Sequence, residues 1–149
     1  MTLKIGDQAP GFEGRDHEGR PVRLADFRGK KVILYFYPKD DTPGCTAEAC
    51  NLRDNYTRLR EAGYEVIGVS ADDEVSHAKF RNKYNLPFIL VADPDHSINE
   101  KYGVWVKKSM FGKKYMGTQR TTFVIDEDGK IAEIIEKIKT GDHAAQILK

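Results

Sequence analysis

The chain has 149 residues, and we expect one domain over residues 1–149, long enough to bury its own core. Its two cysteines could form only one bridge, which excludes a small secreted domain built on a disulfide framework. Its four histidines show no ligand-like spacing to either cysteine, so we expect no metal site. The formal net charge of +1 comes from interspersed acidic and basic residues, so no nucleic-acid partner is indicated.

The sequence gives no sign of a membrane or a secretory route. The longest uncharged apolar run, residues 32–37, is far shorter than the roughly 18 residues of a membrane span. Residues 1–7 show neither the apolar stretch nor the cleavage site of a signal peptide. We therefore expect a soluble, cytoplasmic protein without a membrane partner. In a reducing compartment, two close cysteines are more often reactive than structural.

The predicted elements alternate between strands and helices along the chain. A hairpin is expected over residues 12–24, followed by a strand at 31–37 and a long helix at 42–62. A strand at 65–70, a helix at 74–84, a strand at 88–92 and a helix at 97–102 follow. Strands at 121–126 and 130–136 flank the turn dipeptide Asp128-Gly129, and Asp142 caps a last helix that ends at Leu148. Residues 110–117, which mix basic and aromatic side chains, are expected to form a mobile surface loop near the pocket.

This order predicts a three-layer α/β fold with a mixed central sheet and an extra N-terminal hairpin. Three of the strands are apolar on both faces, which is typical of a sheet covered by helices on each side. The order of elements resembles a thioredoxin-like core. No period of 20 to 50 residues and no linker composition divides the chain further.

Cys45 is expected in the first turn of the helix at 42–62. Thr42 is the N-cap candidate, Pro43 takes the first helical position, and Gly63 ends the helix. Unpaired N–H groups and the positive end of the helix dipole favour a thiolate at such a position. Because a core cysteine needs none of these features, the sequence indicates a reactive Cys45. For Cys50, taken alone, a structural role is favoured.

The five-residue spacing of the cysteines limits how they can react. In a regular helix their Cα atoms would be roughly 8–9 Å apart, whereas a disulfide rarely tolerates more than about 7 Å. If both are helical when reduced, they can form a bridge only after the first turns unwind. We therefore expect oxidation to be coupled to local unfolding between Cys45 and Asn51.

Residues 38–50 carry a resemblance to a known family. Pro38, three residues, Thr42, two residues and Cys45 reproduce the active-site pattern of the peroxiredoxins. The chain is most similar to their bacterioferritin comigratory protein (PrxQ) group, in which Cys50 falls where the resolving cysteine can lie. Residues 6–10 and 120–126 extend the resemblance along nearly the whole chain.

The resemblance implies a thiol-dependent peroxidase that reduces hydrogen peroxide and organic hydroperoxides, with no cofactor and no metal. Cys45 would attack the peroxide, the Thr42 hydroxyl and the Arg120 guanidinium would bind the peroxide oxygens, and Pro38 would form a wall of the pocket. Cys45 would become a sulfenic acid, and Cys50 would condense with it to form a disulfide. Thioredoxin or a similar dithiol would reduce that disulfide. A monomer is expected, because no apolar stripe is left unpaired.

Two other functions stay open at this point. One is a dithiol-disulfide oxidoreductase acting on proteins, although four residues between the cysteines depart from its Cys-x-x-Cys motif. The other is a non-enzymatic redox switch. Pattern alone would place Arg120 on the surface, and the resemblance is the only reason to assign it a role. Glu48 is expected at a surface position of the helix, and Tyr37 and Trp105 are expected to pack or line the pocket.

Overall fold

A seven-stranded mixed sheet forms the centre of the computed structural model, which describes residues 2–149. The strand order is β2-β1-β5-β4-β3-β8-β9. β3, β4 and β5 are parallel, and the other neighbours are antiparallel. The strands are β1 (Glu13–Asp16), β2 (Pro21–Arg23), β3 (Lys31–Phe36), β4 (Tyr64–Ser70), β5 (Ile89–Ala92), β8 (Thr121–Ile125) and β9 (Ile131–Ile135).

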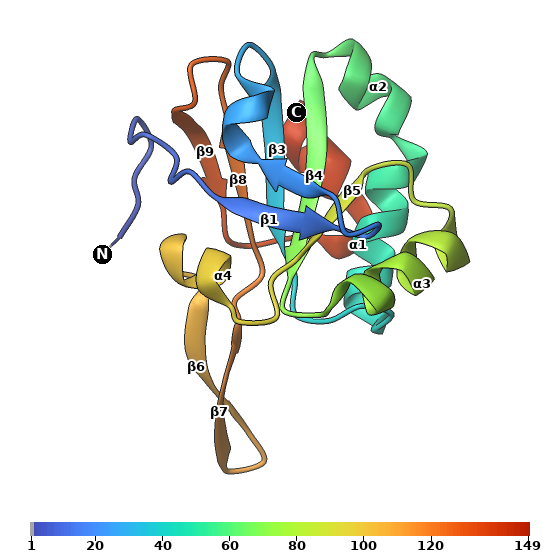
Figure 1. Ribbon diagram of the computed structural model, residues 1–149, viewed down its shortest axis with the longest axis vertical. Helices are drawn as coiled ribbons and strands as arrows, with labels where there is room; N and C mark the ends of the chain where they lie inside the picture. The colour runs from blue at the N-terminus through green and yellow to red at the C-terminus, as the bar shows by residue number, and fades with distance from the viewer. Residues whose placement is uncertain (1) are drawn as a thin grey trace.

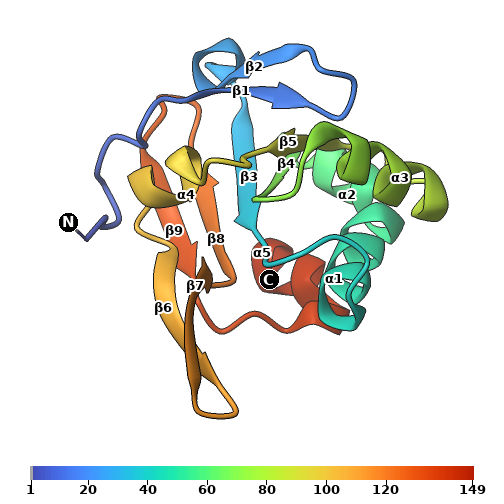
Figure 2. The same ribbon diagram turned by 60° about the horizontal axis from the view of Figure 1, so that its bottom comes forward.

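Helices cover both faces of the sheet, which confirms the predicted three layers (Figures 1 and 2). On one face lie α1 (Pro43–Asp54), α2 (Tyr56–Glu61), α3 (Glu74–Tyr84) and α5 (His143–Leu148). On the other face lie α4 (Ser97–Lys101) and the N-terminal segment. Side chains of β3 alternate between the two cores because successive residues of a strand point to opposite faces: Val32, Leu34 and Phe36 face one, Ile33 and Tyr35 the other.

The predicted helix at 42–62 is two helices, with the break at Asn55. The φ and ψ angles of Asn55 are −109° and 11°, outside the helical range. Its side-chain amide donates to the Asn51 carbonyl oxygen at 2.9 Å and so competes for the acceptor that holds the helix together. The other helices and the N-terminal hairpin agree with the prediction within one or two residues.

The prediction of a loop at residues 110–117 is wrong. These residues belong to a two-stranded hairpin, β6 (Trp105–Met110) and β7 (Lys113–Thr118), which projects away from the body of the molecule (Figures 1 and 2). Its turn residues Phe111 and Gly112 have φ angles of 52° and 79°, as a two-residue hairpin turn requires. The side chains of its outer part are largely exposed, so the strands show no buried face and hence no alternating pattern.

Among residues 2–149, no helix is long and apolar enough to cross a membrane.

The second half of α1 is fixed to its neighbours. The Arg53 guanidinium donates to the Tyr84 carbonyl at the end of α3, at 2.7 Å. The Asn51 side chain donates to the Gly141 carbonyl at 3.0 Å and accepts from the Ala144 N–H at 2.8 Å. These contacts begin at residue 51, one position beyond Cys50. Unwinding of the turns before Asn51 would leave these contacts intact.

We predict that oxidation of the chain to the Cys45–Cys50 disulfide will accelerate backbone hydrogen exchange at residues 46–50, because those turns must unwind. The amides of α2 should keep their protection, since α2 lies beyond the fixed segment. Hydrogen exchange measured by mass spectrometry on reduced and oxidised protein tests this. Equal protection of residues 46–50 in both forms would contradict it.

Candidate active site

Cys45 lies in the first turn of α1, where backbone donors are unpaired. α1 begins at Pro43, so Cys45 is its third residue. The first backbone bond of the helix runs from Thr46 N to Thr42 O, at 2.8 Å. The N–H groups of Gly44 and Cys45 therefore have no carbonyl partner in the helix. Together with the positive end of the helix dipole, they form a site for a negatively polarised oxygen.

Thr42 and Pro38 lie in the loop that leads into Cys45. Thr42 is the N-cap residue, as predicted, but its side chain makes no capping bond. Its hydroxyl donates instead to the Lys39 carbonyl oxygen at 2.8 Å. Pro38 follows β3, is half-buried, and contributes no N–H to the loop.

Arg120 reaches the sulfur of Cys45 from a distant part of the chain. It lies between β7 and β8, and its Nη2 donates to Cys45 Sγ at 3.3 Å. Gly44 makes room for it, because a Cβ there would lie 3.2 Å from Nη2. Cys45 itself is 1% exposed and is a free thiol. The fixed positive charge beside the sulfur would favour any negative charge that develops near it.

Glu48 holds the other side of the same guanidinium. The expectation that Glu48 lies on the surface is wrong, because its side chain is fully buried and its Oε1 accepts from Arg120 Nη1 at 2.8 Å. Burial raises the pKa of Glu48 to about 7, although the charge of Arg120 acts in the opposite direction. Glu48 Oε2 has no hydrogen-bond partner among the described residues. Glu48 therefore lies buried in contact with the arginine that binds the Cys45 sulfur.

His143 is a member of this cluster that sequence reasoning missed. Its Nδ1 lies 2.9 Å from Gln146 Oε1, a carbonyl-type acceptor, so Nδ1 carries the proton. Its Nε2 then accepts from the Thr122 hydroxyl at 2.8 Å and lies 3.6 Å from Glu48 Oε2. Burial lowers the pKa of His143, which favours the neutral ring. No local pattern marks a residue at the start of the C-terminal helix as a neighbour of α1.

Cys50 lies on the same helix as Cys45, and the structure leaves both thiols free. Cys50 is partly exposed, whereas Cys45 is buried. The arrangement thus combines one protected sulfur with one that solvent can reach.

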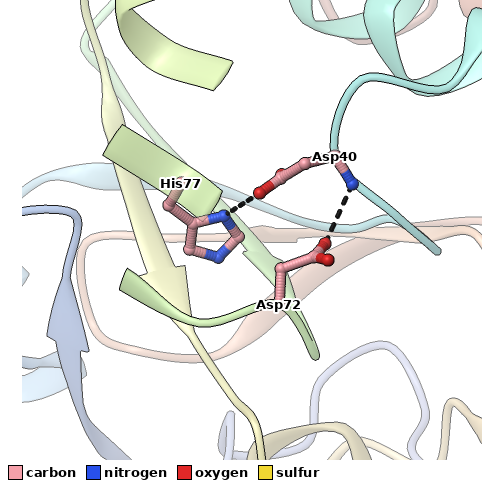
Figure 3. A group of neighbouring side chains, drawn as sticks. All are labelled: Asp40, Asp72 and His77. Carbon is pink, nitrogen blue, oxygen red and sulfur yellow. Dashed lines mark hydrogen bonds and ion pairs between the residues drawn. The ribbon is translucent and has the colours of Figure 1, made fainter. Parts of the chain in front are cut away.

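A second cluster beside the active-site loop contains side chains of the kinds that bind metals. One ligand atom each of Asp40, Asp72 and His77 lie within 4.8 Å of one another (Figure 3). Asp40 Oδ1 already accepts from the Tyr37 hydroxyl at 2.6 Å, and its Oδ2 lies 2.7 Å from both Ser76 Oγ and His77 Nδ1. Because hydrogen-bond donors occupy these oxygens, the cluster acts as a hydrogen-bond network.

Comparison with known proteins identifies the family of the chain. Residues 5–134 match the AhpC/TSA family. The chain is 51% identical to a "Putative peroxiredoxin bcp" of Coxiella burnetii, over 99% of this chain and 98% of that one. It is 46% identical to "Peroxiredoxin Bcp" of Bacillus subtilis, over 100% of this chain and 95% of that one.

A solved structure extends the comparison to the fold. It is a structure of the Xanthomonas campestris bacterioferritin comigratory protein, which has alkyl peroxide reduction activity. The two chains superpose with a TM-score of 0.90 at 30% identity, over 99% of this chain and 93% of that one. This likeness confirms the thioredoxin-like fold. Given these matches, the chain belongs to the AhpC/TSA family, within its Bcp/PrxQ peroxiredoxins, and is a thiol-dependent peroxidase.

Proposed function

We propose that Cys45 is the residue that reduces the peroxide, and that the substrates are hydrogen peroxide and organic hydroperoxides. The observation that carries this proposal is the contact of Arg120 with Cys45 Sγ at 3.3 Å, at the start of a helix. The Cys45 thiolate attacks the terminal oxygen of the hydroperoxide, so an S–O bond forms as the O–O bond breaks. Cys45 becomes a sulfenic acid, and the leaving oxygen takes a proton to give water or an alcohol.

Arg120 and the backbone supply most of the acceleration in this mechanism. A free cysteine is already about 3% thiolate at pH 7, so complete ionisation would gain only about thirtyfold. Larger gains require donors aimed at the oxygens of the breaking bond. Arg120 Nη2 and the N–H groups of Gly44 and Cys45 are such donors. Thr42 and Pro38 shape the pocket before the helix, with Thr42 contacting the peroxide through its hydroxyl.

Cys50 completes the cycle in this proposal. As a thiolate, it attacks the sulfur of the Cys45 sulfenic acid, an S–S bond forms, and the sulfenic oxygen leaves as water after protonation. An external dithiol, a thioredoxin or a similar protein, then reduces the bridge by thiol-disulfide exchange. We further propose that the chain works as one domain over residues 1–149, as a monomer, in the cytoplasm.

The burial of Cys45 bears on the two other functions. A protein disulfide would have to bring its sulfur within bonding distance of an atom that is 1% exposed, whereas a hydroperoxide is small enough to enter. A redox switch would need neither the guanidinium beside the sulfur nor the buried carboxylate that holds it. Both features therefore support a peroxidase over a switch or a protein oxidoreductase.

We predict that the parent protein will lose two hydrogens rapidly after one equivalent of hydrogen peroxide, as the disulfide forms. Cys45→Ser should abolish the fast reaction, and Cys50→Ser should accumulate a sulfenic acid, one oxygen heavier. Intact mass of samples quenched over time tests both. Slow oxidation that Cys45→Ser leaves unchanged would overturn the assignment of Cys45.

We predict that Arg120→Met will lower the rate of Cys45 oxidation by hydrogen peroxide at least about a hundredfold, because a donor to the developing charge is lost. The rate at which iodoacetamide alkylates Cys45 depends on its thiolate but not on peroxide binding. This rate should fall by less than about thirtyfold. Rapid-quench mass spectrometry measures both rates. Arg28→Met removes an arginine outside the site and serves as the control. An Arg120→Met rate equal to that of the parent would remove Arg120 from the mechanism.

We predict a pH-dependent stability that originates at Glu48. Its pKa is about 7 in the folded chain and 4.5 when unperturbed, so the folded state holds its proton more tightly. This favours the folded state at low pH, and the contribution is lost as pH rises from about 4.5 through about 7, by roughly 3 kcal/mol. Glu48→Gln should lack this decline, so its free energy of unfolding relative to the parent should rise between pH 5 and pH 8.

Urea unfolding at pH 5, 6, 7 and 8 tests the Glu48 prediction. Glu61→Gln, which removes an exposed carboxylate, is the matched control and should follow the parent. Parallel pH profiles for the parent and Glu48→Gln would contradict the prediction.

A further inference from the structure

The peptide group between Lys39 and Asp40 connects the hydrogen-bond network of Figure 3 to the active-site loop. Its N–H, on Asp40, donates to Asp72 Oδ2 at 2.9 Å. Its C=O, on Lys39, accepts from the Thr42 hydroxyl at 2.8 Å. One planar group therefore has Asp72 at one end and the Thr42 hydroxyl at the other, and its plane cannot turn without breaking both bonds.

Asp72 is itself held in place for this contact. The same oxygen, Asp72 Oδ2, accepts from the Ser70 hydroxyl at 2.6 Å, and the Asp72 N–H lies 3.2 Å from that hydroxyl oxygen. Ser70 is the last residue of β4 and is fully buried. The acceptor that orients the peptide is thus fixed to the central sheet.

The side chain of Asp40 is also held in place. Its carboxylate is bound by the hydroxyls of Tyr37 and Ser76 and by His77, at 2.6 to 2.7 Å. His77 Nε2 in turn lies 3.0 Å from the Val91 carbonyl oxygen of β5. With its backbone and its side chain both held, Asp40 places the Lys39 carbonyl in one position.

The position of the Lys39 carbonyl determines which kind of hydrogen bond Thr42 can form with a peroxide. A threonine hydroxyl has one proton, and Thr42 gives it to the Lys39 carbonyl. Only its lone pairs are then free for a ligand. Arg120 and the N–H groups of Gly44 and Cys45 can only donate. The hydroxyl of Thr42 thus offers the acceptor that an O–H of a hydroperoxide requires, among groups that otherwise donate.

We propose that Asp72 is a positioning residue for peroxide reduction: through the Lys39–Asp40 peptide, it fixes the Thr42 hydroxyl as an acceptor for the O–H of the hydroperoxide. The inference rests on the proposed function, because it assigns Thr42 to the peroxide site. Asp72 lies outside the loop and acts on the substrate only through Thr42.

The test is a double-mutant cycle of Asp72→Ala and Thr42→Val, read as the rate of Cys45 oxidation by hydrogen peroxide. Asp72→Ala should lower this rate about tenfold, as expected for one misdirected hydrogen bond. In the Thr42→Val background it should have no further effect, because the hydroxyl that Asp72 orients is absent. The rate at which iodoacetamide alkylates Cys45 should be the same in all four proteins, since alkylation needs no bound peroxide.

Two further variants separate positioning from folding. Asp72→Asn keeps an oxygen that can accept from the Asp40 N–H, so it should restore most of the rate. Asp95→Ala is the matched control: Asp95 Oδ1 accepts from Ser97 N at 3.2 Å at the start of α4, so its loss weakens a helix start and leaves the Lys39–Asp40 peptide and the residues that hold it untouched. Its peroxide rate should equal that of the parent.

Three outcomes would overturn the proposal. One is an Asp72→Ala protein as fast as the parent, and another is a loss of equal size in the Thr42→Val background. The third is an equal fall in alkylation rate, which would show a general disturbance of α1. Failure of the proposed function is recognised separately, because the parent itself would then lack rapid, Cys45-dependent oxidation.

Discussion

The guanidinium of Arg120 is held between a buried carboxylate and a buried sulfur, and the active site depends on this arrangement. Glu48 binds it at 2.8 Å and Cys45 Sγ at 3.3 Å, while Gly44 leaves the space it occupies. Burying Glu48 has a cost, seen in its pKa of about 7, and the ion pair only partly offsets that cost. In return, the guanidinium of Arg120 is held in one orientation beside the Cys45 sulfur.

The loop before Cys45 is held rigidly, whereas the first turns of α1 must unwind if Cys45 and Cys50 are to form a disulfide. The loop before α1 is fixed to β4 and α3 through Asp72, Asp40 and His77. The second half of α1 is fixed to α3 and α5 through Arg53 and Asn51. Between these two sets of contacts lie the turns that carry both cysteines. Unwinding of those turns, which the proposed disulfide needs, would leave both sets of contacts in place.

Short-range patterns explain what the sequence predicted correctly and where it failed. The strands and the start of α1 are marked by runs of apolar residues and by Pro43, and the structure has them at the expected positions. The break at Asn55 depends on one side-chain amide reaching a backbone carbonyl, which propensity does not specify. The hairpin at residues 105–118 was missed because its outer part buries little, so its strands lack the alternation that identifies a strand.

Local sequence features were enough to predict a cysteine in the first turn of a helix, a second cysteine five residues later, and the fold that holds them. Which charged groups contact these cysteines depends on how distant segments pack together. Glu48 and Arg120 are 72 residues apart, and His143 comes from the last helix, so no local period relates them to Cys45. The physical reason is that capping and periodicity act within a few residues, whereas the burial of a carboxylate depends on packing between distant segments.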